Sequence, residues 1–193
     1  MQGHVSILSV SPEAAAMIAS GGRISTMDGT ADEIYANSLS AGQEKNEKLI
    51  GKVLSSGHTS VLEHCYVNLS FENVSVLAEQ FLIEFRLASF TVKSRRHVDF
   101  SKAGYVSPVF TDNVQMAIFE RTVESLFGTY DVLEAAGVPK EDARFVLPYC
   151  FCSNFFCSMN ARELVHVMNE LRYGRGKESR GIEELGESVV TQG

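Results

Sequence analysis

The sequence is poor in proline and in charged residues. It has 4 prolines among 193 residues, 21% charged residues and a mean hydropathy of -0.01. Chains that stay disordered combine low hydrophobicity with high charge, so wholesale disorder is excluded. The 45% of hydrophobic residues is enough apolar material for a sizeable core. We therefore expect one compact domain covering residues 1–193.

Basic residues are in the minority. The chain has 17 of them against 24 acidic residues, which gives a formal net charge of -7. Proteins that coat DNA or RNA bind phosphates through pooled lysine and arginine, so a partner of that kind is excluded. A local basic pocket for one small anion is still compatible with this balance.

Long apolar runs are missing. The first twelve residues lack the basic start and apolar core of a secretion signal, and no segment approaches the roughly 20 apolar residues of a membrane span. We expect a soluble, cytoplasmic protein that does not bind membranes.

Cysteine is scarce, and its spacing fits no common zinc pattern. The 4 cysteines are Cys65, Cys150, Cys152 and Cys157, and no second cluster exists that would complete a metal site. We expect no metal site and interpret these residues as structural thiols in a reducing compartment.

Hydrophobic periodicity predicts a few strands among several helices, which is typical of the α+β class. Alternation indicates strands at His4–Val10 and around Cys65–Phe71, with a turn at Glu72-Asn73 and an extended run from Leu147-Pro148 to Asn160. Ser11 and Pro12 are typical of a helix start, and Gly21-Gly22 of its end. Further helices are expected over residues 30–55, 74–85, 112–136, 139–144, 161–172 and 182–190.

The segment GHTSVLEH, residues 57–64, brings hydroxyl, carboxylate and imidazole groups to the junction of a helix and a strand. A loop in such a place presents polar groups to a ligand. The alternative is that Ser60 caps a turn and that Glu63 and His64 are ordinary surface residues. A metal site would need a third ligand, which the sequence does not indicate.

Residues 86–99 are basic in an otherwise acidic protein. The segment contains Arg86, Lys93, Arg95, Arg96 and His97. Arginines with nearby hydroxyls suit a phosphate or a nucleotide, although a solvated basic face is the alternative. Because the chain has no glycine-rich phosphate loop, any nucleotide would be held by side chains.

A third segment, NARELVH, begins a helix at residue 160. Arg162 and His166 are four residues apart and share a helix face. Helix-start N–H groups beside an arginine can bind an anion, while Asn160 can equally be an ordinary N-cap.

Taken in this order, these segments resemble the flavin-dependent thymidylate synthases over about residues 20–187. GHTSVLEH is similar to that family's G-H-x-S-x-x-E-H segment. Residues 84–97 align without a gap with its signature R-H-R-x-x-S-x-N-x-x-S-x-R-Y. ARFVLP, residues 143–148, and NARELVH resemble its A-R-x-x-L-P and N-x-R-x-L blocks. Several ordered blocks are far more specific than any one of them.

The resemblance implies a fold, an assembly and a reaction. The fold would be α+β, with a central mixed or antiparallel sheet flanked by helices. The family assembles as a homotetramer whose active sites combine several subunits. The implied reaction is reductive methylation of dUMP at C5 to give dTMP, with methylenetetrahydrofolate as carbon donor, FAD as redox carrier and NADPH as electron source.

The resemblance also assigns residues. Arg172 would be catalytic, because a guanidinium favours the ionised pyrimidine. The residues implied to contact FAD are His58, Ser60, Glu63, Arg86, Leu87, Asn160, Arg162 and His166. Those implied to hold dUMP are Ser94, Arg95, Arg96, Arg144 and Arg172. The family needs no cysteine nucleophile.

The signature is kept only in part. Glu84, Phe85, Thr91 and His97 stand where the family has Arg, His, Asn and Tyr. A carboxylate at residue 84 removes a cation from the stretch that lies along the flavin in the family. Two alternatives therefore stay open: a flavin enzyme that alkylates another pyrimidine nucleotide, and a non-catalytic nucleotide-binding paralogue or hetero-oligomer subunit.

The last helix departs as well. NARELVHVMNELR carries one residue more than the family's spacing to the arginine thought to polarise the pyrimidine. We expect Arg172 in this role, since it follows a packed helical pattern, whereas Arg175 lies between Gly174 and Gly176. The chain ends soon after this helix, so we expect a short member of the family.

Overall fold

The computed structural model describes residues 3–190, apart from the side chains of residues 178, 180 and 188–190. Its sheet has four strands in the order β1-β2-β4-β3, and every neighbouring pair is antiparallel. The strands are β1 His4–Val10, β2 Tyr66–Ser75, β3 Ala88–Val92 and β4 Cys152–Asn160. The expectation of an α+β fold is confirmed, and of the two sheet types expected the antiparallel one is found.

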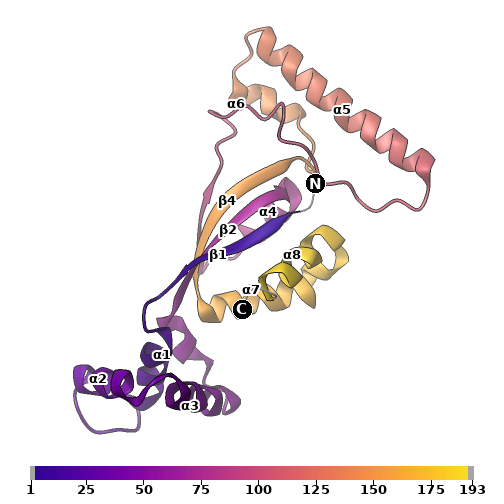
Figure 1. The fold of residues 1–193 in the computed structure, drawn as a ribbon. Coiled ribbons are helices and arrows are strands. Elements are labelled where there is room, and N and C mark those ends of the chain that lie inside the picture. Colours follow the sequence, from indigo (N-terminus) through magenta and orange to yellow (C-terminus); the bar gives the residue numbers. More distant parts are fainter. Residues whose placement is uncertain (1–2, 191–193) are drawn as a thin grey trace.

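Helices gather at both ends of the sheet and along one side of it (Figure 1). The α-helices are α1 Ala14–Arg23, α2 Ala31–Ala41, α3 Gln43–Ser55, α4 Val76–Leu82, α5 Asn113–Ala135, α6 Lys140–Ala143, α7 Ala161–Arg172 and α8 Arg180–Val190. The 3-10 helices are η1 Thr59–His64, η2 Arg144–Val146 and η3 Arg175–Glu178. Within the described residues, no helix is both long and apolar enough to cross a membrane.

One face of the sheet is buried under α4, α7 and α8. Val67, Leu69 and Phe71 alternate along β2 and belong to one core cluster with Val167 and Leu171 of α7. The alternation arises because successive strand residues point to opposite faces. The other face stays open in this chain, as shown by the exposed side chains of Tyr66 and Phe156.

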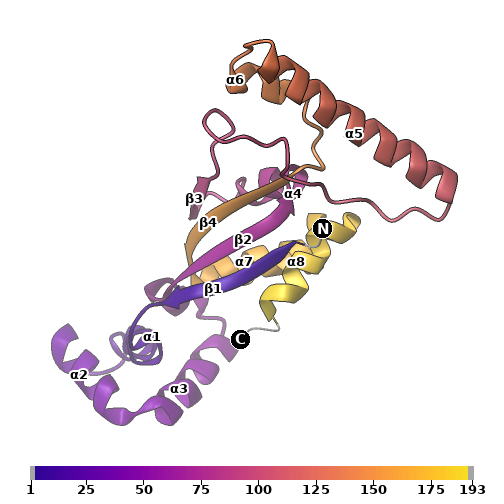
Figure 2. The ribbon, with the colours of Figure 1, turned by 45° about the horizontal axis from the view of Figure 1, so that its top comes forward.

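Two smaller hydrophobic clusters stabilise the two ends of the molecule. Helices α1, α2 and α3 lie beyond one end of the sheet, whereas α5 and α6 lie beyond the other (Figures 1 and 2). The first group packs through Ile18, Val61 and Cys65, and the second through Tyr130 and Phe151 among others. The sheet therefore separates the two groups of helices, which do not share a core cluster.

Gly21, Gly22 and Gly42 have functions that the sequence did not predict. The predicted helix over residues 30–55 is broken at Gly42, whose φ of 79° is accessible to glycine without steric cost. Helix α1 does not end at Gly21-Gly22 but passes through them to Arg23. A Cβ on Gly21 would lie 3.0 Å from His64 Cδ2, so this glycine permits close packing.

The predicted start of the first helix was also wrong. Helix α1 begins at Ala14, after Glu13 in the left-handed region with φ 53°. Ser11 does not cap it, because its Oγ accepts a hydrogen bond from Tyr66 N at 2.9 Å. Ser11 therefore joins the end of β1 to the start of β2.

The predicted turn at Glu72-Asn73 is a bulge within a longer strand. Asn73 has a φ of 53°, and the pairing of β2 with β4 shifts between Phe71 and Val74 before continuing to Ser75. The next helix therefore runs from Val76 to Leu82 instead of over residues 74–85. The basic segment contains β3, a strand that the periodicity did not predict.

Candidate active site

The first and third polar segments meet at the start of α7. Ala161 N donates to Cys65 O at 2.8 Å, which fixes the end of η1 against the first turn of α7. Arg162 Nη1 donates to Glu63 Oε1, and the two side chains are 52% and 45% exposed. Two residues of the expected FAD set are thus neighbours and remain open to a ligand.

Asn160 is the N-cap of α7. Its Oδ1 accepts a hydrogen bond from Glu163 N at 2.8 Å. This satisfies one of the N–H groups that every helix leaves unpaired at its start. The capping interpretation of Asn160 is confirmed, and its contact with FAD stays a prediction.

Residues from the basic segment reach the same end of the sheet. Ala88 of β3 pairs with Met159 of β4, so Arg86 and Leu87 lie beside the strand that leads into α7. Leu87 is 70% exposed. The rings of Phe85 and His166 meet edge to face, with centroids 5.5 Å apart.

His58 and Ser60 are exposed beside this junction. They line a hollow of about 480 Å³ between α1, α3 and η1, together with Lys52 and hydroxyl groups such as that of Thr26. The hollow adds hydrogen-bonding groups next to the residues expected to contact FAD.

Ser94 and Arg96 lie beyond the opposite end of β3. Lys93 N donates to Asn154 O at 3.0 Å, which anchors the start of this loop to β4. Ser94 Oγ accepts from Arg96 N at 3.3 Å, and the Arg96 side chain is exposed. A hydroxyl and a guanidinium are thus available together for an anion.

Arg95 points the other way, into the protein. Its Nη2 donates to both carboxylate oxygens of Glu79 at 2.7 Å, and Glu79 is only 1% exposed. The guanidinium also lies 5.3 Å from the centre of the Phe151 ring. Arg95 therefore anchors the Ser94–Arg96 loop to α4, and direct contact with dUMP stays a prediction.

Arg144 sits on the second helical group. It begins η2 between buried Ala143 and Leu147, and its Nε donates to Glu141 O at 2.8 Å. Phe151, which Arg95 covers, belongs to the same core cluster as those two apolar residues. Arg95 and Arg144, two of the expected dUMP residues, thus lie at the same core cluster.

Arg172 ends α7 and packs against α8. A Cβ on Gly186 would lie 2.9 Å from Arg172 Cγ, and the Arg172 guanidinium lies 5.2 Å from the Tyr173 ring centre. At 1.5 Å per residue, Arg172 lies about 18 Å along the helix from Asn160. The helix therefore separates it from the expected FAD residues at its start.

Arg175 is more constrained than its glycine neighbours suggest. Its Nη1 donates to Glu84 Oε2 at 2.9 Å. A Cβ on Gly176 would lie 2.8 Å from Leu171 Cα, so η3 packs directly on α7. The expectation that Arg172 polarises the pyrimidine stays a prediction, but chain freedom is a weak argument against Arg175.

The cysteines are poorly suited to nucleophilic catalysis. Burial raises the pKa of Cys157 to about 12 and also raises the pKa values of Cys65, Cys150 and Cys152. A thiol with a raised pKa stays protonated at neutral pH and reacts slowly. Within the part of the chain that the structure describes, no group of His, Cys, Asp and Glu side chains could hold a metal ion.

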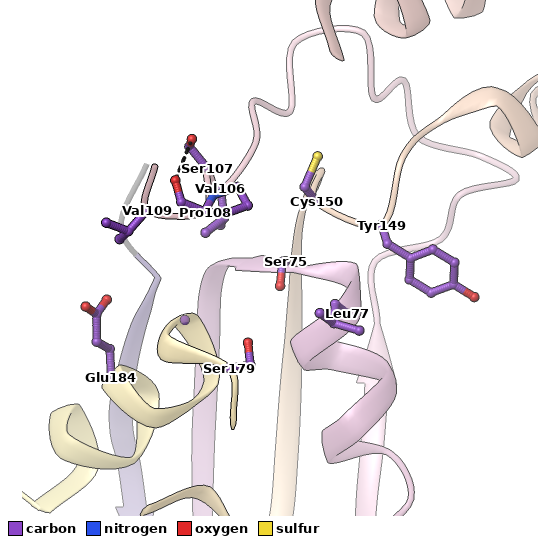
Figure 3. A pocket seen from close by; sticks show the side chains of 11 residues that line it. Ser75, Leu77, Val106, Ser107, Pro108, Val109, Tyr149, Cys150, Ser179 and Glu184 are labelled. Carbon is purple, nitrogen blue, oxygen red and sulfur yellow. Dashed lines mark hydrogen bonds between the residues drawn. The ribbon is translucent and has the colours of Figure 1, made fainter. Parts of the chain in front are cut away.

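A separate hollow of about 640 Å³ contains none of the expected site residues. It lies between the start of α4, residues 106–109 and α8, and Leu77, Cys150 and Glu184 are among the side chains around it (Figure 3). The hollow therefore adds nothing to the flavin or nucleotide assignment.

Comparison with known proteins identifies the family. The model of the family described as Thymidylate synthase complementing protein matches residues 6–190. A flavin-dependent thymidylate synthase of Geobacter sulfurreducens is 34% identical over 166 residues, which are 84% of this chain and 70% of that protein. One from Nitratidesulfovibrio vulgaris is 32% identical over 179 residues, 86% of this chain and 73% of that protein.

Solved structures agree on the fold. A UMP/dUMP methylase, PolB, from Streptomyces cacaoi bound with 5-Br dUMP superposes with a TM-score of 0.77 and 22% identity, covering 98% of this chain and 89% of that one. Thymidylate Synthase X from Helicobacter pylori with FAD and dUMP gives a TM-score of 0.71 and 21% identity, with 98% and 92% covered. From the family match and the two relatives, the chain belongs to the flavin-dependent thymidylate synthases.

Proposed function

We propose that this protein catalyses the flavin-dependent reductive methylation of dUMP at C5, which yields dTMP. Methylenetetrahydrofolate would donate the carbon, and NADPH would supply electrons through FAD. The family match over residues 6–190 carries this proposal. We place the reaction in the cytoplasm, a reducing compartment that suits four free thiols.

The donor set at the start of α7 fits FAD. Arg162, Arg86 and Ser60 offer exposed N–H and O–H groups, which suit a pyrophosphate. The exposed ring of His166 offers a flat surface to a heteroaromatic ring, and the buried Phe85 ring supports it edge to face. Bound FAD would supply the redox chemistry, and these residues would bind and orient it.

The Ser94–Arg96 loop and Arg144 fit the phosphate of dUMP. Arg96 is exposed, and Arg95 below it is fixed by Glu79, so the loop is held while Arg96 faces outward. A fixed donor needs less ordering when the anion binds. Arg172 would stabilise negative charge on the pyrimidine as C5 becomes nucleophilic.

We further propose that the active site combines more than one copy of the chain, in a homotetramer. Strand β3 separates the expected FAD residues from Ser94, and five residues of strand span about 13 Å between the first and last Cα. A second copy would bring one set against the other. A different subunit in a hetero-oligomer would serve the same purpose.

The proposal is tested by flavin uptake and product analysis. The purified protein is incubated with excess FAD, desalted, and inspected for absorbance at about 450 nm, which oxidised flavin shows. It is then given methylenetetrahydrofolate and NADPH with either dUMP or UMP, and products are identified by mass. We expect retained flavin and formation of dTMP.

Other outcomes overturn the proposal in distinct ways. Methylation of UMP without dTMP formation would indicate an enzyme for another pyrimidine nucleotide. Binding of dUMP without retained flavin would indicate a non-catalytic paralogue or a subunit of a hetero-oligomer.

A further inference from the structure

Three contacts converge on the guanidinium of Arg175 in η3. Its Nη1 donates to Glu84 Oε2 at 2.9 Å, and its Nε lies 3.7 Å from Glu170 Oε2. Its Cζ lies 5.1 Å from the centre of the Phe81 ring. These partners come from α4, from the turn after α4 and from α7, so segments far apart in the sequence hold one side chain.

The pair of Arg175 and Glu84 is too exposed to contribute much to stability. The two side chains are 62% and 56% exposed, and ion pairs of that kind stabilise a fold only slightly. Together, the contacts with Glu84, Glu170 and the Phe81 ring orient the guanidinium. Because arginine has several N–H donors in one plane, groups that do not face Glu84 stay available to a ligand.

A row of rings connects Arg175 to the expected FAD residues. The Phe81 ring, on which the guanidinium lies, meets the Phe85 ring edge to face at 5.7 Å. Phe85 in turn meets His166 at 5.5 Å. Arg175 is therefore the cationic end of a continuous row that ends in a residue of the expected FAD set.

The family signature gives a reason to compare Glu84 with Arg175. Glu84 stands where the family signature has its first arginine, and Arg175, from a segment later in the chain, places its guanidinium 2.9 Å from the Glu84 carboxylate. We propose that Arg175 supplies the cation at this end of the FAD site and that Glu84 is a positioning residue that holds it. The inference rests on the proposed function, and its ligand chemistry is an anionic cofactor with a flat ring system.

The test moves the cation between the two positions. Replacing Arg175 by Gln should weaken FAD binding by about tenfold or more, the effect of one lost charge-assisted hydrogen bond. Adding Glu84→Arg to Arg175→Gln should return the affinity to within about threefold of the original, because residue 84 then carries the cation. Glu84→Arg alone places two guanidinium groups together and should weaken binding through like-charge repulsion. Affinities are measured by fluorescence titration of the flavin-free protein.

The double variant separates ligand binding from a structural role. Glu84→Arg with Arg175→Gln has no ion pair, so a restored FAD affinity cannot come from a restored salt bridge. Lys177→Gln is the control, since it removes an exposed cation of the same η3 segment. Melting temperatures of all variants verify that they fold.

Two results would overturn the inference and leave the proposed function intact. One is an Arg175→Gln variant that binds FAD as tightly as the original protein. The other is a double variant that binds FAD as weakly as Arg175→Gln. Failure of the original protein to take up FAD would instead overturn the proposed function, and this inference with it.

Discussion

Arg96 is the exposed cation of a loop whose neighbour, Arg95, is fixed by Glu79. Replacing Arg96 by Ala should remove a charge-assisted contact of roughly 1.5–3 kcal/mol and weaken dUMP binding about ten- to a hundredfold. Calorimetric titration with dUMP measures this. Arg121→Ala, on the exposed side of α5, is the matched control. An unchanged affinity of the Arg96 variant would contradict the role assigned to it.

Arg172 and Arg175 should differ in their effect on turnover. At saturating FAD, Arg172→Ala should lower kcat by about a hundredfold or more, because the charge on the pyrimidine loses its stabilising group. Arg175→Ala should mainly raise the FAD concentration that is needed. Steady-state rates at several FAD concentrations separate the two effects, and a larger loss of kcat in Arg175→Ala would reverse the assignment.

At the scale of elements, the pair of Glu79 and Arg95 connects α4 to the loop after β3. Glu79→Ala leaves the charge of Arg95 partly buried beside Phe151 without its partner, so it should reduce the free energy of unfolding by about 3–5 kcal/mol. Urea denaturation measures the change. Glu79→Leu combined with Arg95→Met should lose much less, because no unpaired charge remains. An equal loss would contradict the explanation by an unpaired charge.

The sequence predicted most elements, because their signals are local. The alternation of β1 and β2 and the cap of α7 at Asn160 depend on neighbouring residues only. Strand β3 was missed, since a basic segment becomes a strand here by pairing with β4, a contact of long sequence separation.

The candidate site could also be predicted only in part. Motif resemblance selected Glu63 and Arg162, which the fold brings together. It did not indicate that Glu79 binds Arg95 or that Glu84 binds Arg175. The pair of Glu79 and Arg95 had one local signal, the carboxylate of Glu79 within the apolar run of α4.

For the whole molecule, the separation of the two expected residue sets predicts complementation between copies. At limiting FAD and dUMP, Arg162→Ala and Arg96→Ala should each be nearly inactive as pure proteins. Mixed under conditions that exchange subunits, they should regain part of the activity, because some sites would combine an intact FAD set with an intact dUMP set. Light scattering gives the assembly size. If the assembly exchanges subunits and the mixture still stays inactive, the FAD and dUMP residues of each site come from one subunit.

The expectation of one domain over residues 1–193 leads to a prediction about unfolding. The sheet core and the two end clusters should unfold together, since β2 and β4 each connect one end cluster to the other. Circular dichroism and intrinsic tyrosine fluorescence should then report coincident transitions. Separate transitions would indicate that an end cluster unfolds on its own.

Strand β3 is a spacer of nearly fixed length. An extended strand that is hydrogen-bonded to β4 cannot shorten or stretch appreciably, so Arg86 and Ser94 keep their separation whichever ligand is bound. Binding at one end therefore cannot pull the other end closer. In the proposed oligomer, any approach of cofactor and nucleotide would come from the reach of the two ligands or from rotation of one subunit against another.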